Sequence, residues 1–216
     1  MSEKLMIIIL ARKGSKRLKN KNILLFHNKP LVCWTIEQAI RFKKITDRII
    51  ISTDNLEILK YKKNYKDVDF IKRPTYLSES NSTSVDAIKH ILKKTKFKGN
   101  LILLQPTSPL RKDKDISKVI TLIKKGFSPI MSVCKHSHNT SLIFENKNYE
   151  KCRPVVKKKK RVCYPNGAIY AAHSNWISCN TSFYTQDTYT YFMKEQDSID
   201  IDFKYQFIMA EALFKK

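Results

Sequence analysis

The sequence predicts an α/β fold in which a mostly parallel sheet is covered by helices on both faces. Short apolar runs and helix-like segments alternate along the chain at spacings of about 20–30 residues, which is typical of βαβ units. Of the 216 residues, 42% are hydrophobic and only four are glycine, which excludes disordered and collagen-like classes. A chain of this length suits one compact domain with at most a small appendage.

The predicted strands are short apolar runs, as expected of strands that are buried on both faces of a parallel sheet. The first is Leu5–Leu10, with the sequence LMIIIL, and a strongly basic loop follows it. Further strands are predicted at residues 48–52, 68–71, 101–104, 130–134 and 168–172.

The predicted helices lie between these strands. Residues 31–42 place apolar side chains on one helix face, and Pro30 suits the helix start. Asp54, with Glu57 three residues later, is typical of a capping box that opens a second helix. Further helices are predicted at residues 85–92, at 113–124 with Asp113 as its cap, and at 204–214.

One segment interrupts this alternation. Residues 136–163 are polar and contain the cationic run 157–161, which would fit poorly inside a sheet. We therefore expect a core made of residues 1–135 and 164–216, with a hairpin or arm inserted at 136–163.

The charge of the chain is unevenly distributed. Lys and Arg number 42 against 19 Asp and Glu, which gives a formal net charge of +23. Residues 1–30 hold eight basic residues and one acidic residue, whereas residues 183–216 hold four basic and six acidic residues. Surface lysines account for much of the excess. Their clustering around one loop favours a polyanionic partner, either a nucleic acid or a nucleoside triphosphate.

The sequence also predicts a cytoplasmic protein that does not bind membranes. The six-residue apolar run Leu5–Leu10 is far shorter than the roughly 20 residues of a spanning helix. It is also shorter than the core of a signal peptide. The five cysteines are scattered and form no Cys-x-x-Cys pair, so free thiols in a reducing compartment are expected.

Three loops carry residues suited to phosphate and metal chemistry. Residues 11–22 follow the first strand, at the sheet edge where parallel sheets bind ligands. Their backbone N–H groups and cations can surround phosphates, although neither a Walker A motif nor a Gly-x-Gly-x-x-Gly motif is present. Residues 104–111 form a second, proline-flanked polar loop. The alternative for both loops is an ordinary surface turn.

The third loop, residues 197–202, contains two carboxylates. In an extended segment Asp200 and Asp202 point to the same side, and a divalent cation would relieve their repulsion. Taken alone, this triplet would more often be an ordinary loop. Opposite a phosphate-binding loop, it favours Mg²⁺-assisted transfer of a nucleotidyl group.

Four motifs occur in order along the chain: ARKGSKRLKNKN at 11–22, LQPTSPLR at 104–111, PNGAIY at 165–170 and QDSIDID at 196–202. With these motifs the chain resembles the acylneuraminate cytidylyltransferase (CMP-sialic acid synthetase) family over essentially its whole length. The resemblance implies a Rossmann-like nucleotidyltransferase core and a homodimer in which each arm covers the partner's site. The implied reaction joins CTP to a nonulosonic acid, giving a CMP-sugar and pyrophosphate.

The resemblance also implies roles for individual residues. Arg12, Lys16 and Lys21 would hold the triphosphate and stabilise the departing pyrophosphate, and with Asp202 they form the implied catalytic set. The residues implied to bind the nucleotide are Arg12, Ser15, Asn22, Arg73 and Ser82, of which the last two would line the cytosine pocket.

For the sugar, the resemblance implies contact with Gln105 and a pocket shaped by Tyr170, Phe183 and Tyr184. Packing in the hydrophobic core is the alternative for Tyr170 and Phe183. Asp200 and Asp202 would bind Mg²⁺ or Mn²⁺, and Asp202 would also orient or deprotonate the sugar hydroxyl.

The arm departs from the family pattern, because the arginine expected to face the sugar carboxylate is missing from its place. Arg153, Lys157 or Arg161 would have to substitute for it, and Ser141 stands where the family sometimes has lysine. N-acetylneuraminate, legionaminate and pseudaminate therefore all remain open. The alternative functions are a nucleotidyltransferase acting on another sugar, a non-enzymatic nucleic-acid-binding protein and a non-catalytic homologue.

Overall fold

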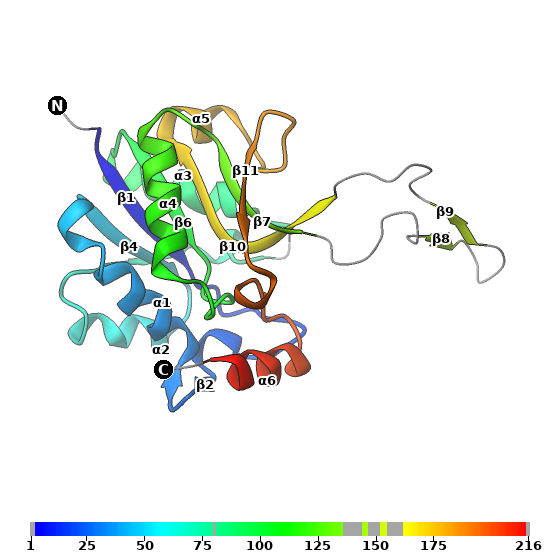
Figure 1. Ribbon diagram of the computed structural model, residues 1–216. Coiled ribbons are helices and arrows are strands. Elements are labelled where there is room, and N and C mark those ends of the chain that lie inside the picture. Colours follow the sequence, from blue (N-terminus) through cyan, green and yellow to red (C-terminus); the bar gives the residue numbers. More distant parts are fainter. Residues whose placement is uncertain (1–2, 80, 136–143, 147–151, 155–161, 215–216) are drawn as a thin grey trace.

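The computed structural model describes residues 3–79, 81–135, 144–146, 152–154 and 162–214. A central sheet runs through the molecule in the order β11-β7-β10-β6-β1-β4-β5 (Figure 1). The strands of this sheet are β1 (Leu5–Leu10), β4 (Arg48–Thr53), β5 (Asp69–Lys72), β6 (Asn100–Leu104), β7 (Ile130–Lys135), β10 (Cys163–His173) and β11 (Tyr189–Met193).

The sheet is mostly parallel, as predicted. β4 and β6 flank β1 in parallel, β5 continues from β4, and β11 is parallel to β7. β10 is the exception, because it lies antiparallel between β6 and β7. Its register against β7 shifts between Pro165 and Tyr170, so the strand is irregular at that point.

Helices cover both faces of the sheet. α1 (Leu31–Ile40), α2 (Leu56–Lys60) and α4 (Asp113–Lys124) pack on one face, and α3 (Ser84–Thr95) and α5 (Ser174–Cys179) pack on the other (Figure 1). In β1, Ile7 and Ile9 belong to the first core cluster, whereas Met6 and Ile8 belong to the second. Burial on both faces explains why β1 is a continuous apolar run.

The last helix, α6 (Lys204–Leu213), packs beside the β2–β3 hairpin (Leu25–Phe26 and Lys29–Pro30). Single 3₁₀ turns complete the described chain at Lys21–Ile23 (η1), Lys43–Ile45 (η2), Tyr61–Lys63 (η3), Thr75–Leu77 (η4) and Glu195–Asp197 (η6). None of the helices in the described ranges combines the length and the apolar character needed to cross a membrane.

Two predicted helix caps were wrong by one residue. The cap of α2 is Asn55, whose side chain accepts a hydrogen bond from the Glu57 backbone N–H at 2.9 Å. Asp54 instead accepts a bond from the Lys13 backbone N–H at 2.7 Å, which fixes the basic loop after β1. α4 begins at Asp113 rather than after it, with Lys112 in the cap position.

The inserted segment is described only in part. β8 (Phe144–Asn146) and β9 (Cys152–Pro154) pair antiparallel in a two-stranded sheet that lies apart from the central sheet (Figure 1). The expected arm at 136–163 stays a prediction. The remaining arm residues, including Ser141, Lys157 and Arg161, lie outside the described residues.

A buried arginine secures the loop that follows β6. Arg111 is 3% exposed and donates through Nη1 to the carbonyls of Gln105 (3.1 Å) and Ala168 (2.8 Å), and through Nε to Gln38 (3.0 Å). Burial lowers its pKa to about 9, although Asp113 and Asp115 oppose that effect. The guanidinium thereby ties the loop 105–110 to β10 and α1.

We expect Arg111→Ala to lower the free energy of unfolding by about 3 kcal/mol, because each buried oxygen that accepts a hydrogen bond from Arg111 would lose that donor. Arg48→Ala is the matched control, since it removes an exposed arginine paired with Asp69 at 2.6 Å and should cost about 0–1 kcal/mol. Urea denaturation of both variants measures the difference. Equal losses would show that Arg111 does not secure the loop.

Candidate functional site

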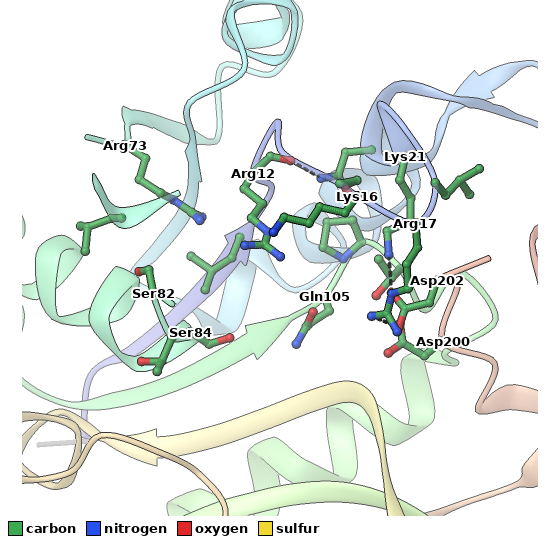
Figure 2. A pocket seen from close by; sticks show the side chains of 18 of the residues that line it. Arg12, Lys16, Arg17, Lys21, Arg73, Ser82, Ser84, Gln105, Asp200 and Asp202 are labelled. Carbon is green, nitrogen blue, oxygen red and sulfur yellow. Dashed lines mark hydrogen bonds and ion pairs between the residues drawn. The ribbon is translucent and has the colours of Figure 1, made fainter. Parts of the chain in front are cut away.

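A cleft of about 750 Å³ opens at the carboxyl ends of β1, β5 and β6 (Figure 2). Five separate segments meet there: the loop after β1, the chain between β5 and α3, the loop after β6, the chain between α5 and β11, and the residues before α6. Its polar and aromatic lining residues include Arg12, Ser15, Lys16, Arg17, Lys21, Asn22, Arg73, Ser82, Ser84, Gln105, Thr107, Tyr184, Asp200 and Asp202.

The structure therefore gathers in one cleft all but two of the residues singled out from the sequence. Figure 2 shows Arg73, Ser82 and Ser84 towards one end and Asp200 and Asp202 at the other, with the basic loop between them. The lining contains five cations and two carboxylates. Such a cleft favours a ligand that carries several negative charges.

The loop after β1 is held in place by hydrogen bonds from its backbone and from two of its side chains. The N–H of Ala11 donates to the carbonyl of Ser52 at 3.0 Å, and the Asn22 amide donates to the carbonyl of Arg12 at 2.9 Å. Arg12 also donates through Nη1 to the Glu79 carbonyl at 3.1 Å. These bonds fix the loop while the side chain of Lys16 is left directed into the cleft (Figure 2).

Lys21 joins the basic loop to the acidic end of the chain. Its buried ammonium donates to the Ile201 carbonyl and, at 2.9 Å, to Asp202 Oδ1. Arg17, which the sequence did not single out as a site residue, pairs with Asp202 Oδ2 at 2.6 Å. The signal that could have identified Arg17 was its position in the basic motif at residues 11–22.

Asp200 lies deeper than Asp202. Burial is the main cause that raises its pKa, and the charge of Asp202 adds to the effect, whereas a hydrogen bond with Thr107 opposes it. Asp200 Oδ1 is buried and has no hydrogen-bond partner among the described residues. A buried carboxylate oxygen without a hydrogen-bond partner is suited to bind a cation or to accept a hydrogen bond from a ligand.

Gly167 makes room for this carboxylate. Its backbone adopts φ +70°, and a Cβ placed there would lie 2.8 Å from Asp200 Oδ2. The neighbouring Asn166 donates to Ser198 Oγ at 2.9 Å and accepts from Ser132 Oγ at 2.6 Å. Both residues lie in the motif PNGAIY, and neither was predicted to have a role. The irregular part of β10 therefore positions the segment that carries Asp200.

The opposite end of the cleft is suited to a neutral heterocyclic group. Arg73 is buried and donates through Nη2 and Nε to the carbonyl and hydroxyl of Ser52, at 2.8 and 3.2 Å. Burial lowers its pKa to about 10, while Asp54 opposes that effect. Ser82 Oγ and Asn22 Oδ1 are buried without hydrogen-bond partners in the described chain. Both atoms belong to residues that line the cleft and are available to a ligand.

The three aromatic residues predicted to contact sugar are placed differently. Tyr184 lines the cleft, whereas Tyr170 and Phe183 are 4% exposed and belong to a core cluster. The hydroxyls of Tyr170 and Tyr184 lie 3.0 Å apart, and the rings of Tyr170 and Phe183 pack at 5.0 Å. Tyr170 thus supports Tyr184 from within the core, and Phe183 packs against Tyr170 in the cluster under α3 and α5. A sugar contact for them stays a prediction.

The acidic pair fits a magnesium ion better than a metal with many protein ligands. No group of three or more His, Cys, Asp and Glu side chains in the described ranges could hold a metal. Mg²⁺ usually takes one or two carboxylates and completes its shell with phosphate oxygens and water. The four described free cysteines, Cys33, Cys134, Cys163 and Cys179, do not line the cleft.

A family model described as Cytidylyltransferase matches residues 6–215. The N-acylneuraminate cytidylyltransferase of Escherichia coli is 30% identical over 229 residues, which cover 100% of this chain and 53% of that protein. The CMP-N,N'-diacetyllegionaminic acid synthase of Legionella pneumophila is 26% identical over 226 residues, with coverage of 98% and 97%. This chain spans about half the length of the first curated relatives.

A solved structure of CMP:2-keto-3-deoxy-manno-octonic acid synthetase complexed with CTP has a TM-score of 0.73. The alignment covers 97% of this chain and 98% of that one, at 16% sequence identity. This similarity concerns the fold, and it confirms the predicted Rossmann-like nucleotidyltransferase core.

We expect Gly167→Ala to destabilise the protein more than Gly126→Ala does. Both glycines have positive φ, so alanine should cost about 1–2 kcal/mol at either position. Only at position 167 would the new Cβ collide with Asp200, which should add about 1–3 kcal/mol. Thermal unfolding compares the two variants. Equal losses would contradict a close approach of Asp200 to this backbone.

Asp200→Asn should raise the free energy of unfolding at pH 7, because the ionised carboxyl is disfavoured where it lies. The folded protein raises the pKa of Asp200, so it binds the proton more strongly than the unfolded chain does. The advantage of the variant should therefore shrink as the pH falls through that pKa, towards the unfolded value near 3.9. Denaturation across pH measures it, with Asp67→Asn as an exposed control. A loss of stability at pH 7 would contradict the assigned burial cost.

Proposed function

Because the chain belongs to the cytidylyltransferase family, we propose that it transfers the cytidylyl group of CTP to a nonulosonic (sialic-type) acid. The products are a CMP-sugar and pyrophosphate. The observation that carries this proposal is the meeting of the basic loop with the Asp200–Asp202 segment in one cleft, opposite the pocket of Arg73 and Ser82.

The length and polarity of the cleft suit a nucleoside triphosphate. The base binds near Arg73 and Ser82, where Ser82 Oγ is a buried polar atom without a partner in the described chain. Ser15 and Asn22, which belong to the basic loop, also hold the nucleotide, and Asn22 Oδ1 is likewise free to accept a hydrogen bond. This end of the cleft therefore selects the base through hydrogen bonds to protein atoms that would otherwise stay unpaired.

The phosphates lie among the loop cations. Arg12, Lys16 and Lys21 bind the triphosphate and neutralise the charge that builds up on the departing pyrophosphate. The anomeric hydroxyl of the sugar attacks the α-phosphorus, so one P–O bond forms while the bond to pyrophosphate breaks. Transfers of this kind depend mainly on positioning and charge neutralisation.

The acidic pair acts at the reacting end. Asp202 orients the sugar hydroxyl or accepts its proton, and the Lys21 ion pair at 2.9 Å fixes the orientation of its carboxylate. Asp200 and Asp202 would also hold Mg²⁺ or Mn²⁺, for which Asp200 Oδ1 offers an open ligand position. The metal would supply further positive charge next to the phosphate oxygens.

The sugar lies between the nucleotide and Tyr184, within reach of Gln105 on the cleft wall. Tyr170 shapes this pocket from behind through its contact with Tyr184, and Phe183 packs in turn against Tyr170. We infer a homodimer in which the arm 136–163 covers the partner's site, acting in the cytoplasm without nucleic acid or membrane. The relatives act on different sugars by name, so N-acetylneuraminate, legionaminate and pseudaminate are all candidates.

Pyrophosphate release from CTP and Mg²⁺ with a panel of nonulosonic acids tests this function. We expect release with at least one acid, and a loss of about 10²–10³-fold in Asp202→Asn. Asp69→Asn is the control, because Asp69 pairs with Arg48 at 2.6 Å just as Asp202 pairs with Arg17, but outside the cleft. This control should retain activity.

Two results would contradict the proposal. One is a folded protein that releases no pyrophosphate with any acid of the panel. The other is salt-sensitive binding to duplex DNA without any turnover of CTP, which would indicate that the basic loop serves nucleic acid instead.

A further inference from the structure

Both carboxylate oxygens of Asp202 are already engaged in ion pairs. Oδ1 lies 2.9 Å from Lys21 Nζ, and Oδ2 lies 2.6 Å from Arg17 Nη2. A divalent cation that binds Asp202 must therefore share or displace at least one of these partners. Which partner leaves depends on how firmly each cation is held.

Lys21 is fixed. Its side chain is 11% exposed, and its ammonium also binds the Ile201 carbonyl, so two neighbouring acceptors hold it in the cleft wall. Displacing this ammonium would leave a buried charge and a buried carbonyl without partners. Breaking such an arrangement is costly.

Arg17 is held more loosely. Its side chain is 57% exposed, and besides Asp202 its guanidinium lies over the Phe203 ring, 5.2 Å from the centroid. Exposed ion pairs and exposed cation–π contacts are weak, so water can replace both at little cost. Arg17 is therefore the partner that a competing cation can displace.

We propose that Arg17 is a displaceable counter-ion of Asp202, which occupies Oδ2 until a divalent cation takes its place. This inference rests on the proposed function, because it requires Asp202 to be a metal ligand. Arg17 compensates the acidic pair while no metal is bound, because Asp200 and Asp202 line the same end of the cleft (Figure 2). Arg17 is thus a positioning residue that sets how easily the metal binds.

Removal of the counter-ion should strengthen metal binding. In Arg17→Gln, Oδ2 is free of its competitor, and we expect the affinity for Mn²⁺ without nucleotide to rise about two- to fivefold. Lys16→Gln is the matched control. It removes one positive charge from the same loop and the same cleft, but the structure gives Lys16 no ion pair with Asp202 among the described residues. Its effect measures the general loss of charge.

The experiment is a titration of Mn²⁺ into each variant, with free Mn²⁺ followed by electron paramagnetic resonance. Asp202→Asn and the double variant Arg17→Gln/Asp202→Asn complete the set. Thermal unfolding of every variant confirms that each one is folded under the conditions of the titration. The inference holds if Arg17→Gln binds Mn²⁺ more tightly than Lys16→Gln does and if Asp202→Asn abolishes that gain.

The remaining outcomes separate the two claims. If Asp202→Asn weakens Mn²⁺ binding but Arg17→Gln binds no more tightly than Lys16→Gln, Arg17 is not a counter-ion that the metal displaces. If Asp202→Asn leaves Mn²⁺ binding unchanged, Asp202 is not a metal ligand. In that case the metal assignment of the proposed function falls, and this inference falls with it.

Discussion

The contact of Lys21 with Ile201 and Asp202 joins residues about 180 positions apart in the chain, and the cleft depends on it. The sheet brings the loop after β1 to the same edge as the loop after β6. The acidic segment is held at that edge by a hydrogen bond from the Ile201 N–H to the Thr107 carbonyl at 2.8 Å, and within the segment Gln206 accepts from the Asp202 N–H at 2.7 Å. One buried ammonium then closes the cleft between the two segments.

This arrangement explains why the total charge is less informative than its placement. Several cations pair with exposed carboxylates on the surface, as Lys43 does with Asp67 and Arg48 with Asp69. Such pairs contribute little to stability and indicate no partner. Inside the cleft, cations outnumber carboxylates and several buried oxygens lack partners in the described chain. The burial of Asp200 costs stability, as expected where a site is organised for a ligand rather than for the fold.

The sequence predicted most of the fold because strands buried on both faces leave a distinctive apolar run, as Leu5–Leu10 does. It missed β11 at the sheet edge, since Tyr189–Met193 is largely exposed and shows no such run. The antiparallel direction of β10 could not be predicted either. The direction of a strand depends on how the chain connects it to its neighbours, and not on its amino-acid composition. Edge position and strand direction are properties of the assembled sheet.

The site was predictable to the same extent. The basic loop and the acidic pair were found because each is a local cluster of charge, and the structure brings both to one cleft. The space that Gly167 leaves for the Asp200 carboxylate was not predictable, because it arises where the register of β10 shifts. Likewise, only the assembled core shows that Tyr170 and Phe183 stand behind Tyr184.

The central claim is that the two charged segments form one nucleotide and metal site. A crystal structure with CTP and Mn²⁺, with the metal located by its anomalous scattering, tests this most directly. The account predicts one Mn²⁺ bound by Asp200 and Asp202, next to phosphates that are held by Arg12, Lys16 and Lys21. A nucleotide bound outside the cleft, or Mn²⁺ away from both carboxylates, would contradict it.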